Sequence, residues 1–353
     1  MQKSNFFCLY FLSICLILLL SCTKTSNEGA VDKVKREKEK VVIGFSIDTL
    51  ALERWQRDLD IFIDTVGELG GEVIVQNAGN SIEMQNKQLL YLLSKKVDSV
   101  VILAKKCDTL SESIQKFRSK NIPVIAYDRL ITKADISMYI SVNTQSVGEI
   151  MAKNMLKRST GGNWFCILGP EDDYNMTLLH RGIQNGIKNT GIRIVQTYFT
   201  QGWNYDVSYQ EAVNVITGKI TPNAIICGND AVAGSVIQAV SDYYGEKHIP
   251  ICGQDADIAA CQNIVRGKQE FTVYKPITSL SAKAAECAVL LAKGIAVEDL
   301  PDIKEQKQTI DNGFAEIPVV WLEPKLVTKE NIDSVIIDTG FHTKGEIYGQ
   351  SNY

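Results

Sequence analysis

Residues 41–77 read VVIGFSIDTLALERWQRDLDIFIDTVGELGGEVIVQN, and this stretch decides the fold. Apolar runs stand at 41–47 and 72–76. They are continuous rather than alternating, which is typical of parallel strands buried on both faces. Between them, apolar side chains recur at three- and four-residue intervals, which predicts a helix over 53–69 with one buried face. A strand, a helix and a second parallel strand form the repeating unit of an α/β fold.

The same pattern continues along the rest of the chain. Further strands are expected at 99–103, 124–127, 164–168, 192–198, 224–227, 249–252 and 271–273. Further helices are expected at 81–95, 110–120, 176–189, 205–216, 231–243, 258–265 and 279–292. A length of 353 residues suits two domains, since a domain averages about 150 residues.

We therefore predict an α/β protein of two similar lobes. Each lobe is expected to be a parallel sheet covered by helices on both faces, and a hinge near 141–143 joins the lobes. The first lobe would comprise 41–143 plus about 279–308, the second 144–278 plus about 309–342, and 343–353 would form a tail. Open parallel sheets bind ligands at the carboxyl ends of their strands, so a cleft between the lobes is the expected site.

The N-terminus has the features of a targeting signal followed by a tether. Lys3 precedes a 15-residue apolar run at 6–20, which is shorter than the roughly 20 residues of a membrane span and fits a secretory signal. The run ends in Leu-Leu-Ser-Cys and resembles a bacterial lipobox. This predicts a lipoprotein signal peptide over 1–21 and lipidation at Cys22, because two acyl chains anchor stably. A plain signal peptide and a retained membrane anchor remain alternatives.

Residues 22–40 are polar and densely charged, which predicts a flexible tether, with a solvated helix as the alternative. The chain is thus expected outside the cytoplasm, anchored by lipid to a bacterial membrane. The formal net charge of −4 argues against a nucleic-acid partner. Three widely spaced histidines argue against a His-rich metal centre, and we expect no cofactor.

Six cysteines lie beyond the tether, at positions 107, 166, 227, 252, 261 and 287. An even number in an extracytoplasmic chain permits disulfides. Cys166, Cys227 and Cys252, however, stand inside apolar strand-like runs, where cysteine behaves as a small hydrophobe. Buried free thiols are the favoured interpretation, and a Cys227–Cys252 bridge stays open.

Polar and aromatic residues follow nearly every predicted strand. They are Asp48, Arg54, Trp55, Asp128, Arg129, Asp173, Asn175, Trp203, Asn229, Asp255 and Lys275. Each hydroxyl of a sugar donates and accepts hydrogen bonds, so a sugar site needs carboxylates and amides beside Arg and Lys. The apolar face of a pyranose packs on indole. A phosphate site would instead show a glycine-rich loop at a helix start, and none is present.

Several segments resemble the periplasmic binding proteins of sugar ABC importers, of the ribose/galactose type. The segments are DTLALERWQRDLDIF (48–62), IAYDRLITKADISMYIS (125–141), CGNDAVAGSVIQA (227–239), GQDAD (253–257), TVYKPIT (272–278) and GFH (340–342). Within that family the chain looks closest to the D-xylose-binding proteins. The resemblance implies the type I periplasmic binding protein fold, a monosaccharide ligand, D-xylose in the first place, and an ABC permease with its ATPase as partners.

The resemblance also implies roles for single residues. Arg54 would contact the sugar, and Trp55 and Trp203 would stack on it. The remaining polar contacts implied are Asp128, Arg129, Asp173, Asn175, Asn229, Asp255 and Lys275. Two departures concern sugar preference: Tyr174 stands inside an Asp-Asn-Asn stretch and could narrow the cleft, and Ala-Lys-Lys at 104–106 replaces Pro and Asn.

Each residue also has a structural alternative. Arg54 and Asp58 have the spacing of a surface i,i+4 pair, Trp55 could belong to a helix core, and Trp203 could anchor a loop. Lys275, before a proline, could be a solvated turn residue. Three residues could cap the helices that follow them, namely Asn229, Asp255 and Asp230, and for Asp230 capping is the favoured role.

The sequence therefore predicts a monomeric, lipid-anchored binding protein without catalysis. It would capture a monosaccharide by hinge closure and deliver it to the importer. An alternative output is signalling to a sensor kinase or chemoreceptor. A cytoplasmic regulator would need an N-terminal helix-turn-helix. A sugar enzyme is disfavoured because Ser/Cys–His motifs and metal-ligand spacings are absent.

Overall fold

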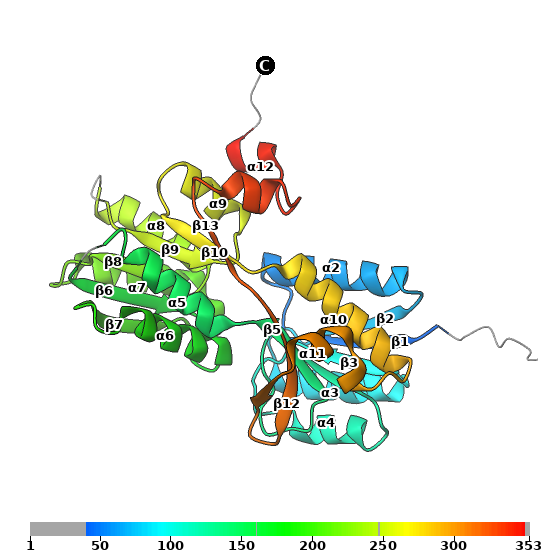
Figure 1. Ribbon diagram of the computed structural model, residues 1–353. Coiled ribbons are helices and arrows are strands. Elements are labelled where there is room, and N and C mark those ends of the chain that lie inside the picture. Colours follow the sequence, from blue (N-terminus) through cyan, green and yellow to red (C-terminus); the bar gives the residue numbers. More distant parts are fainter. Residues whose placement is uncertain (1–39, 160, 246–247, 350–353) are drawn as a thin grey trace, which may run out of the picture. The chain divides into compact units, whose positions relative to one another are not determined.

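The computed structural model describes residues 40–159, 161–245 and 248–349. The expected signal peptide, Cys22 and nearly all of the expected tether lie outside this part of the chain. The described residues belong to one compact unit, which contains two sheets (Figure 1).

The first sheet has seven strands in the order β11-β12-β5-β4-β3-β1-β2. Its strands are β1 (Val42–Ile47), β2 (Glu72–Asn77), β3 (Ser99–Ile102), β4 (Val124–Tyr127), β5 (Met138–Val142), β11 (Gln308–Asp311) and β12 (Glu316–Leu322). All pairings are parallel except that of β11 with β12.

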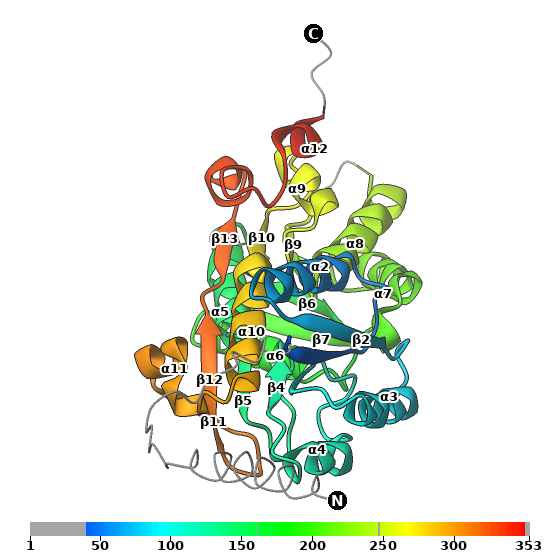
Figure 2. The same ribbon diagram turned by 90° about the vertical axis from the view of Figure 1, so that its right-hand side faces the viewer.

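Helices cover both faces of this sheet, as the continuous apolar strands predicted. The helices α2 (Glu53–Glu68) and α10 (Ile277–Ala292) pack side by side on one face (Figures 1 and 2). The other face carries α3 (Ile82–Ser94) and α4 (Ser111–Arg118). Alternate residues of β3 face the two helix layers. Val101 packs on the side of α2 and α10, and Val100 and Ile102 pack on the side of α3 and α4. A short α11 (Pro301–Gln306) lies beside β12, and a 3-10 turn η2 (Val297–Asp299) packs against α11.

The second sheet has six strands in the order β13-β10-β9-β8-β6-β7. They are β6 (Asn163–Leu168), β7 (Arg193–Phe199), β8 (Ala224–Cys227), β9 (Ile251–Gln254), β10 (Phe271–Tyr274) and β13 (Lys325–Val327), and only β13 is antiparallel to its neighbour. One face carries α5 (Thr144–Met155) and α6 (Tyr174–Ile187). The other carries α7 (Tyr205–Thr217) and α8 (Asp230–Tyr243), and α9 (Ile258–Val265) packs beside α8.

Three segments connect the two sheets: β5 to α5, β10 to α10, and β12 to β13. The predicted two-lobed α/β architecture is thus confirmed. The assignment of 309–342 to the second lobe is corrected. β12 pairs with β5 and β11 pairs with β12, so both strands belong to the first sheet. The Trp321 ring meets Tyr139 edge-on at 5.4 Å between centroids. The sequence predicts no strand at 308–311 or 316–322, and a local pattern does not say which sheet a returning strand joins.

Several further elements are not predicted by the sequence. The expected seam covers the end of β5 and the start of α5, whose N-cap Asn143 accepts from Ser146 N at 3.0 Å. Beyond the turn η3 (Asp333–Ile337), the expected tail contains α12 (Lys344–Tyr348), which begins with a capping box of Thr343 and Glu346.

The cysteines at 107, 166, 227, 252, 261 and 287 are all free in the structure, and all but Cys107 are buried. The favoured interpretation of buried thiols therefore holds for these five, and Cys227 and Cys252 form no bridge. Among the described residues, no helix is both long and apolar enough to cross a membrane.

Candidate functional site

A cavity of about 350 Å³ lies where strand ends of the two lobes face each other. All ten residues predicted to bind a ligand line it: Arg54, Trp55, Asp128, Arg129, Asp173, Asn175, Trp203, Asn229, Asp255 and Lys275. Asp48 does not line the cavity, but its carboxylate accepts a hydrogen bond from Arg129. The parallel topology explains this convergence, because the carboxyl ends of parallel strands lie at one edge of a sheet.

Arg54 stands in the first turn of α2 and is surrounded by carboxylates. Its guanidinium pairs with Asp128, lies 3.6 Å from Asp255 of the other lobe, and has Nε 3.8 Å from Asp58. The side chains of Arg54 and Asp58 are only 6% and 1% exposed, so the surface-pair interpretation is wrong. The guanidinium also lies 4.3 Å above the Trp55 ring. Trp55 is both a core residue and a cavity wall, since it packs in the main core and lines the cavity.

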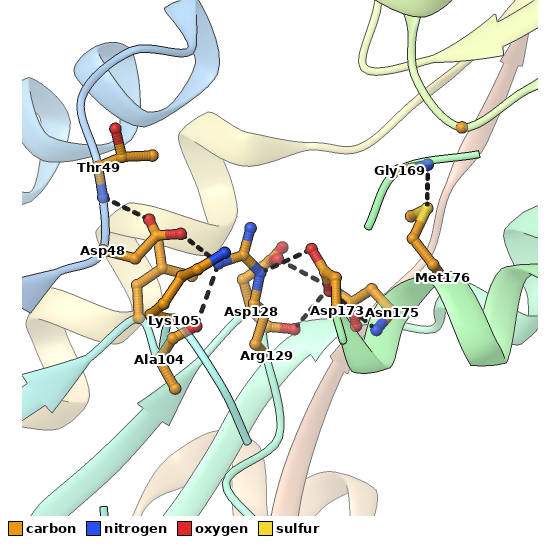
Figure 3. A network of polar contacts seen from close by, with 12 residues as sticks. Asp48, Thr49, Ala104, Lys105, Asp128, Arg129, Gly169, Asp173, Asn175 and Met176 are labelled. Carbon is orange, nitrogen blue, oxygen red and sulfur yellow. Dashed lines mark hydrogen bonds and ion pairs between the residues drawn. The ribbon is translucent and has the colours of Figure 1, made fainter. Parts of the chain in front are cut away.

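Arg129 is fixed by partners in both lobes (Figure 3). Its Nη1 donates to Asp48 at 2.5 Å and to the carbonyl of Ala104 at 3.1 Å, both in the first lobe. Its Nε lies 3.0 Å from Oδ2 of Asp173 in the second lobe. Its neighbour Asp128 has a left-handed backbone, with φ of 60°, which turns the chain as it leaves β4.

The start of α6 supplies two of the predicted residues. Asp173 caps the helix by accepting from Asn175 N at 3.0 Å. The Asn175 amide donates across the cavity to Asp128 at 3.0 Å (Figure 3). Tyr174 does not line the cavity; it packs, half-buried, against the apolar cluster of the first lobe. The expectation that Tyr174 narrows the cleft is therefore wrong. Asp173 and Asn175 face the cavity, whereas the Tyr174 ring between them faces the first lobe's apolar cluster.

The residues at 104–106 lie beside the site rather than in it. Ala104 offers its carbonyl to Arg129, and the backbone N–H of Lys105 donates to Gln85 at 2.9 Å. None of the three lines the cavity.

Trp203 occupies a tight 3-10 turn, η1 (Gln201–Trp203), with left-handed φ of 62° at Gly202 and 57° at Trp203. Its ring lies directly against Gly169, at the end of β6. A Cβ built on Gly169 would stand 2.3 Å from the ring, which no real contact allows. The absence of a side chain at Gly169 thus sets where Trp203 walls the cavity.

The helix cap at the start of α8 is Asn229, not Asp230 as the sequence favoured. Asn229 caps α8, accepting from Val232 N at 2.8 Å, and also lines the cavity. Asp230 is not a cap: it accepts from Thr272 Oγ1 at 2.7 Å and from Asp257 N at 3.1 Å. The correction follows from backbone position, since Asn229 is the extended residue before the helix.

Asp255 and Lys275 form an ion pair at the ends of β9 and β10, with 3.0 Å between Nζ and Oδ1. The Lys275 side chain is 4% exposed, so it is not a solvated turn residue. Asp255 does not cap a helix; the residue before α9 is Asp257.

A protein-family model described as the periplasmic binding protein domain matches residues 43–296. This chain belongs to the periplasmic binding protein family. It is 38% identical over 311 residues to a D-xylose-binding periplasmic protein of Haemophilus influenzae, covering 87% of this chain and 92% of that protein. It is 36% identical over 338 residues to a D-xylose-binding periplasmic protein of Escherichia coli, covering 94% and 98%.

A solved ABC transporter solute-binding protein from Clostridium phytofermentans, with bound β-D-glucose, has the same fold. The TM-score is 0.79 at 24% identity, covering 87% of this chain and 99% of that chain. The named relatives of this periplasmic binding protein are substrate-binding proteins rather than enzymes. Over the residues described, no group of three or more His, Cys, Asp or Glu side chains is placed to hold a metal ion.

Carboxylic side chains outnumber basic side chains in the cavity of this binding protein. Six carboxylates line it (Glu53, Asp128, Asp173, Asp230, Asp255 and Asp257) against three bases (Arg54, Arg129 and Lys275). Burial raises the pKa of Asp257 to about 7, and the nearby charges of Asp255 and Glu53 add to that effect. Burial also opposes ionisation of Asp128, but Arg54, Lys275 and Arg129 outweigh it and lower the Asp128 pKa.

The sequence reading missed several lining residues: Glu53, Met176, Tyr205, Gln254 and Asp257. Three of them carried a signal, because Glu53 stands within the quoted segment 48–62, and Gln254 and Asp257 stand within GQDAD. Met176 looks like an ordinary core residue of α6, and nothing in its sequence context marks a cavity wall. Tyr205 opens α7 directly after the Trp203 turn, a position that only the fold reveals.

Proposed function

We propose that this periplasmic binding protein captures D-xylose in the cavity between its lobes and delivers it to an ABC importer. The observation that carries the proposal is the convergence of all ten predicted residues on one cavity. The match to D-xylose-binding proteins along nearly the whole chain supports the choice of sugar. A volume of about 350 Å³ lies near the lower end of ligand pockets, which span roughly 300–1,000 Å³, and suits a small ligand.

The chemistry of the cavity suits a polyhydroxylated ligand. Arg54, Arg129 and Lys275 would donate to ring and hydroxyl oxygens. Asp128, Asp173 and Asp255 would accept from hydroxyls, and Asn175 and Asn229 offer both functions. Trp55 and Trp203 would pack on the apolar faces of the ring.

Two buried polar atoms at the cavity wall support a polar ligand. The indole Nε1 of Trp55 and the amide Oδ1 of Asn175 have no hydrogen-bond partner among the described residues. Burying an unpaired donor or acceptor is costly. A sugar hydroxyl would satisfy either atom.

The ion pairs of the cavity define the substrate class further. A neutral sugar can accept from the three bases and donate to the acids. Arg54, Arg129 and Lys275 are already paired with carboxylates, so the charge of a uronic acid or a sugar phosphate would find no free base in this buried cavity. We therefore propose a neutral monosaccharide.

The site draws on both lobes, so its ligand would favour the closed arrangement. A ligand shifts such an equilibrium by the difference between its affinities for the two states. Hinge motion at the three connecting segments would open and close the cavity. The closed, loaded form would be the one presented to the permease and its ATPase.

We also propose that Cys22 is acylated and tethers a monomer to the outer side of a membrane through 22–40. The lipobox-like Leu-Leu-Ser-Cys supports this. Labelling cells with a palmitate analogue tests it: the wild-type chain should carry the label, and Cys22→Ser should not. Label on neither chain would contradict the anchor.

A signalling output is the second candidate. The fold also occurs in a fructose-binding periplasmic domain of a hybrid two-component system, with a TM-score of 0.73 at 17% identity. Deleting the gene separates the outputs, because a transport role requires loss of D-xylose uptake even when the importer genes are expressed from another promoter. Unchanged uptake would favour signalling.

The binding claim is tested first by thermal unfolding of sugar-free protein with a panel of sugars. D-xylose should raise the unfolding temperature more than D-ribose, L-arabinose, D-glucose or D-galactose, and D-glucuronate should have no effect. A larger shift with another sugar would keep the cavity and overturn the choice of D-xylose.

A further inference from the structure

A buried carboxylate lies beneath the cavity without reaching it. Asp58 stands on α2, one turn after Arg54, and is fully buried. Its Oδ2 accepts from the Tyr127 hydroxyl at 2.6 Å. Its backbone carbonyl accepts from the Ser281 hydroxyl of α10, so the two helices fix this turn. Asp58 is absent from the cavity lining.

Asp58 is one of three carboxylates around the Arg54 guanidinium, and it differs from the other two. Asp128 and Asp255 line the cavity, where a sugar would compete for their oxygens. Asp58 lies behind, 3.8 Å from Nε of Arg54 and out of the ligand's reach. It is therefore the carboxylate whose contact with Arg54 survives when the cavity is occupied.

Stability does not explain a charge at this position. Burial raises the pKa of Asp58 to about 7, although Arg54 and the Tyr127 hydrogen bond act to lower it. The carboxylates of Asp128 and Asp255 raise it further. Oδ1 of Asp58 has no hydrogen-bond partner among the described residues. A neutral side chain of the same shape would cost the fold less desolvation.

We infer that Asp58 is a positioning residue, whose carboxylate holds the Arg54 guanidinium over Trp55 in the orientation that binds the sugar. This inference rests on the proposed function for its effect on affinity. Oδ2 of Asp58 accepts from the Tyr127 hydroxyl and is also the atom that faces Arg54 Nε. An amide can keep an oxygen in that place, but it lacks the negative charge that attracts the guanidinium.

The test is Asp58→Asn, with Asp64→Asn as the matched control on the exposed face of the same helix. D-xylose affinity is measured by calorimetry between pH 5.5 and 8.5, and unfolding of the ligand-free protein is measured in parallel. At pH 8, Asp58→Asn should bind roughly tenfold more weakly than wild type. Its unfolding temperature should be unchanged or higher. Asp64→Asn should match wild type in both.

The pH profile separates positioning from a structural role. Wild-type Asp58 becomes protonated as the pH falls through about 7, so the affinity gap between wild type and Asp58→Asn should close toward pH 5.5. Asp257 also titrates near pH 7, but it is present in both proteins and leaves the gap unaffected. Equal affinity at pH 8, a gap independent of pH, or weaker binding with an equal loss of stability would each overturn the inference.

A ligand-free readout keeps this test apart from the proposed function. The Nε–Hε NMR signal of Arg54, assigned with Arg54→Lys, should shift with pH near 7 more strongly in wild type than in Asp58→Asn, because the titration of Asp257 is common to both proteins. If no sugar binds wild type while the signal behaves in this way, the proposed function fails and the positioning role stands. A signal that is identical in the two proteins overturns the positioning role whatever binds.

Discussion

Nε of Arg129 lies 3.0 Å from Oδ2 of Asp173, so one buried ion pair joins the end of β4 in the first lobe to the start of α6 in the second. The Asn175 amide reinforces it with a hydrogen bond to Asp128. Two consecutive residues of one strand end thus contact the cap and first turn of one helix. The lobes contact each other through side chains that also line the cavity. Changing one of these side chains should therefore affect both ligand contacts and the closing of the lobes.

Arg129→Lys tests this coupling. A lysine has a single ammonium group and cannot serve Asp48, the Ala104 carbonyl and Asp173 together, as the guanidinium fork does. Hydrogen bonds to charged groups contribute about 1.5–3 kcal/mol each. We expect D-xylose affinity, measured by calorimetry, to fall by roughly tenfold or more.

The control for that variant is Arg118→Lys. Arg118 contacts Asp135 at 3.2 Å in a partly exposed pair away from the cavity. It should leave the affinity unchanged. Wild-type affinity in Arg129→Lys would show that the cross-lobe ion pair is dispensable for binding.

Gly169→Ala should act on the cavity through Trp203. The added methyl group would stand 2.3 Å from the indole, so the ring must move. We expect altered tryptophan fluorescence and roughly tenfold weaker D-xylose binding. Gly67→Ala is the matched control, because no atom lies within 4 Å of a Cβ at Gly67. A Gly169→Ala protein with wild-type spectrum and affinity would contradict the role assigned to the Trp203 ring.

Asp257→Asn should stabilise the ligand-free protein at alkaline pH. Burial raises the pKa of Asp257 to about 7, whereas a free aspartate titrates at about 3.9. The folded state therefore binds the proton more tightly, and this contribution to stability is lost as the pH rises through about 7. The variant should unfold at a higher temperature than wild type at pH 8, with a smaller difference at pH 5.5.

The comparison between variant and wild type is necessary because other groups titrate in the opposite sense. Burial lowers the pKa of His180 and of His342, so these residues favour unfolding as the pH falls. They are common to both proteins and cancel in the difference. An Asp257→Asn protein that is less stable than wild type at pH 8 would contradict the assignment.

The sequence predicts β1–β4 and β6–β10, and ten of the residues that line the cavity, because both depend on local patterns. Asp128, Asn229 and Asp255 stand within a few residues of the ends of predicted strands, and parallel topology brings such positions together. Tyr174 could not be placed in this way. Whether its ring meets the cavity or the first lobe depends on how α6 is oriented, which involves residues distant in the chain.

The same limit explains the misassigned strands and the missed buried carboxylate. The sequence predicts no strand at 316–322, and the pairing of β12 with β5 depends on residues distant in the chain. Asp58 has the i,i+4 spacing of an exposed pair with Arg54. Only the packing of α10 and Tyr127 over that helix face makes it buried.

The most direct test of the central claim is a calorimetric titration of purified, sugar-free protein with D-xylose. We predict saturable binding of one D-xylose per chain, weaker binding of D-glucose and D-ribose, and no heat with D-glucuronate. Loss of the D-xylose signal in Arg54→Ala should accompany this result. No heat from wild-type, folded protein with any neutral sugar would contradict the assignment of the cavity to a monosaccharide.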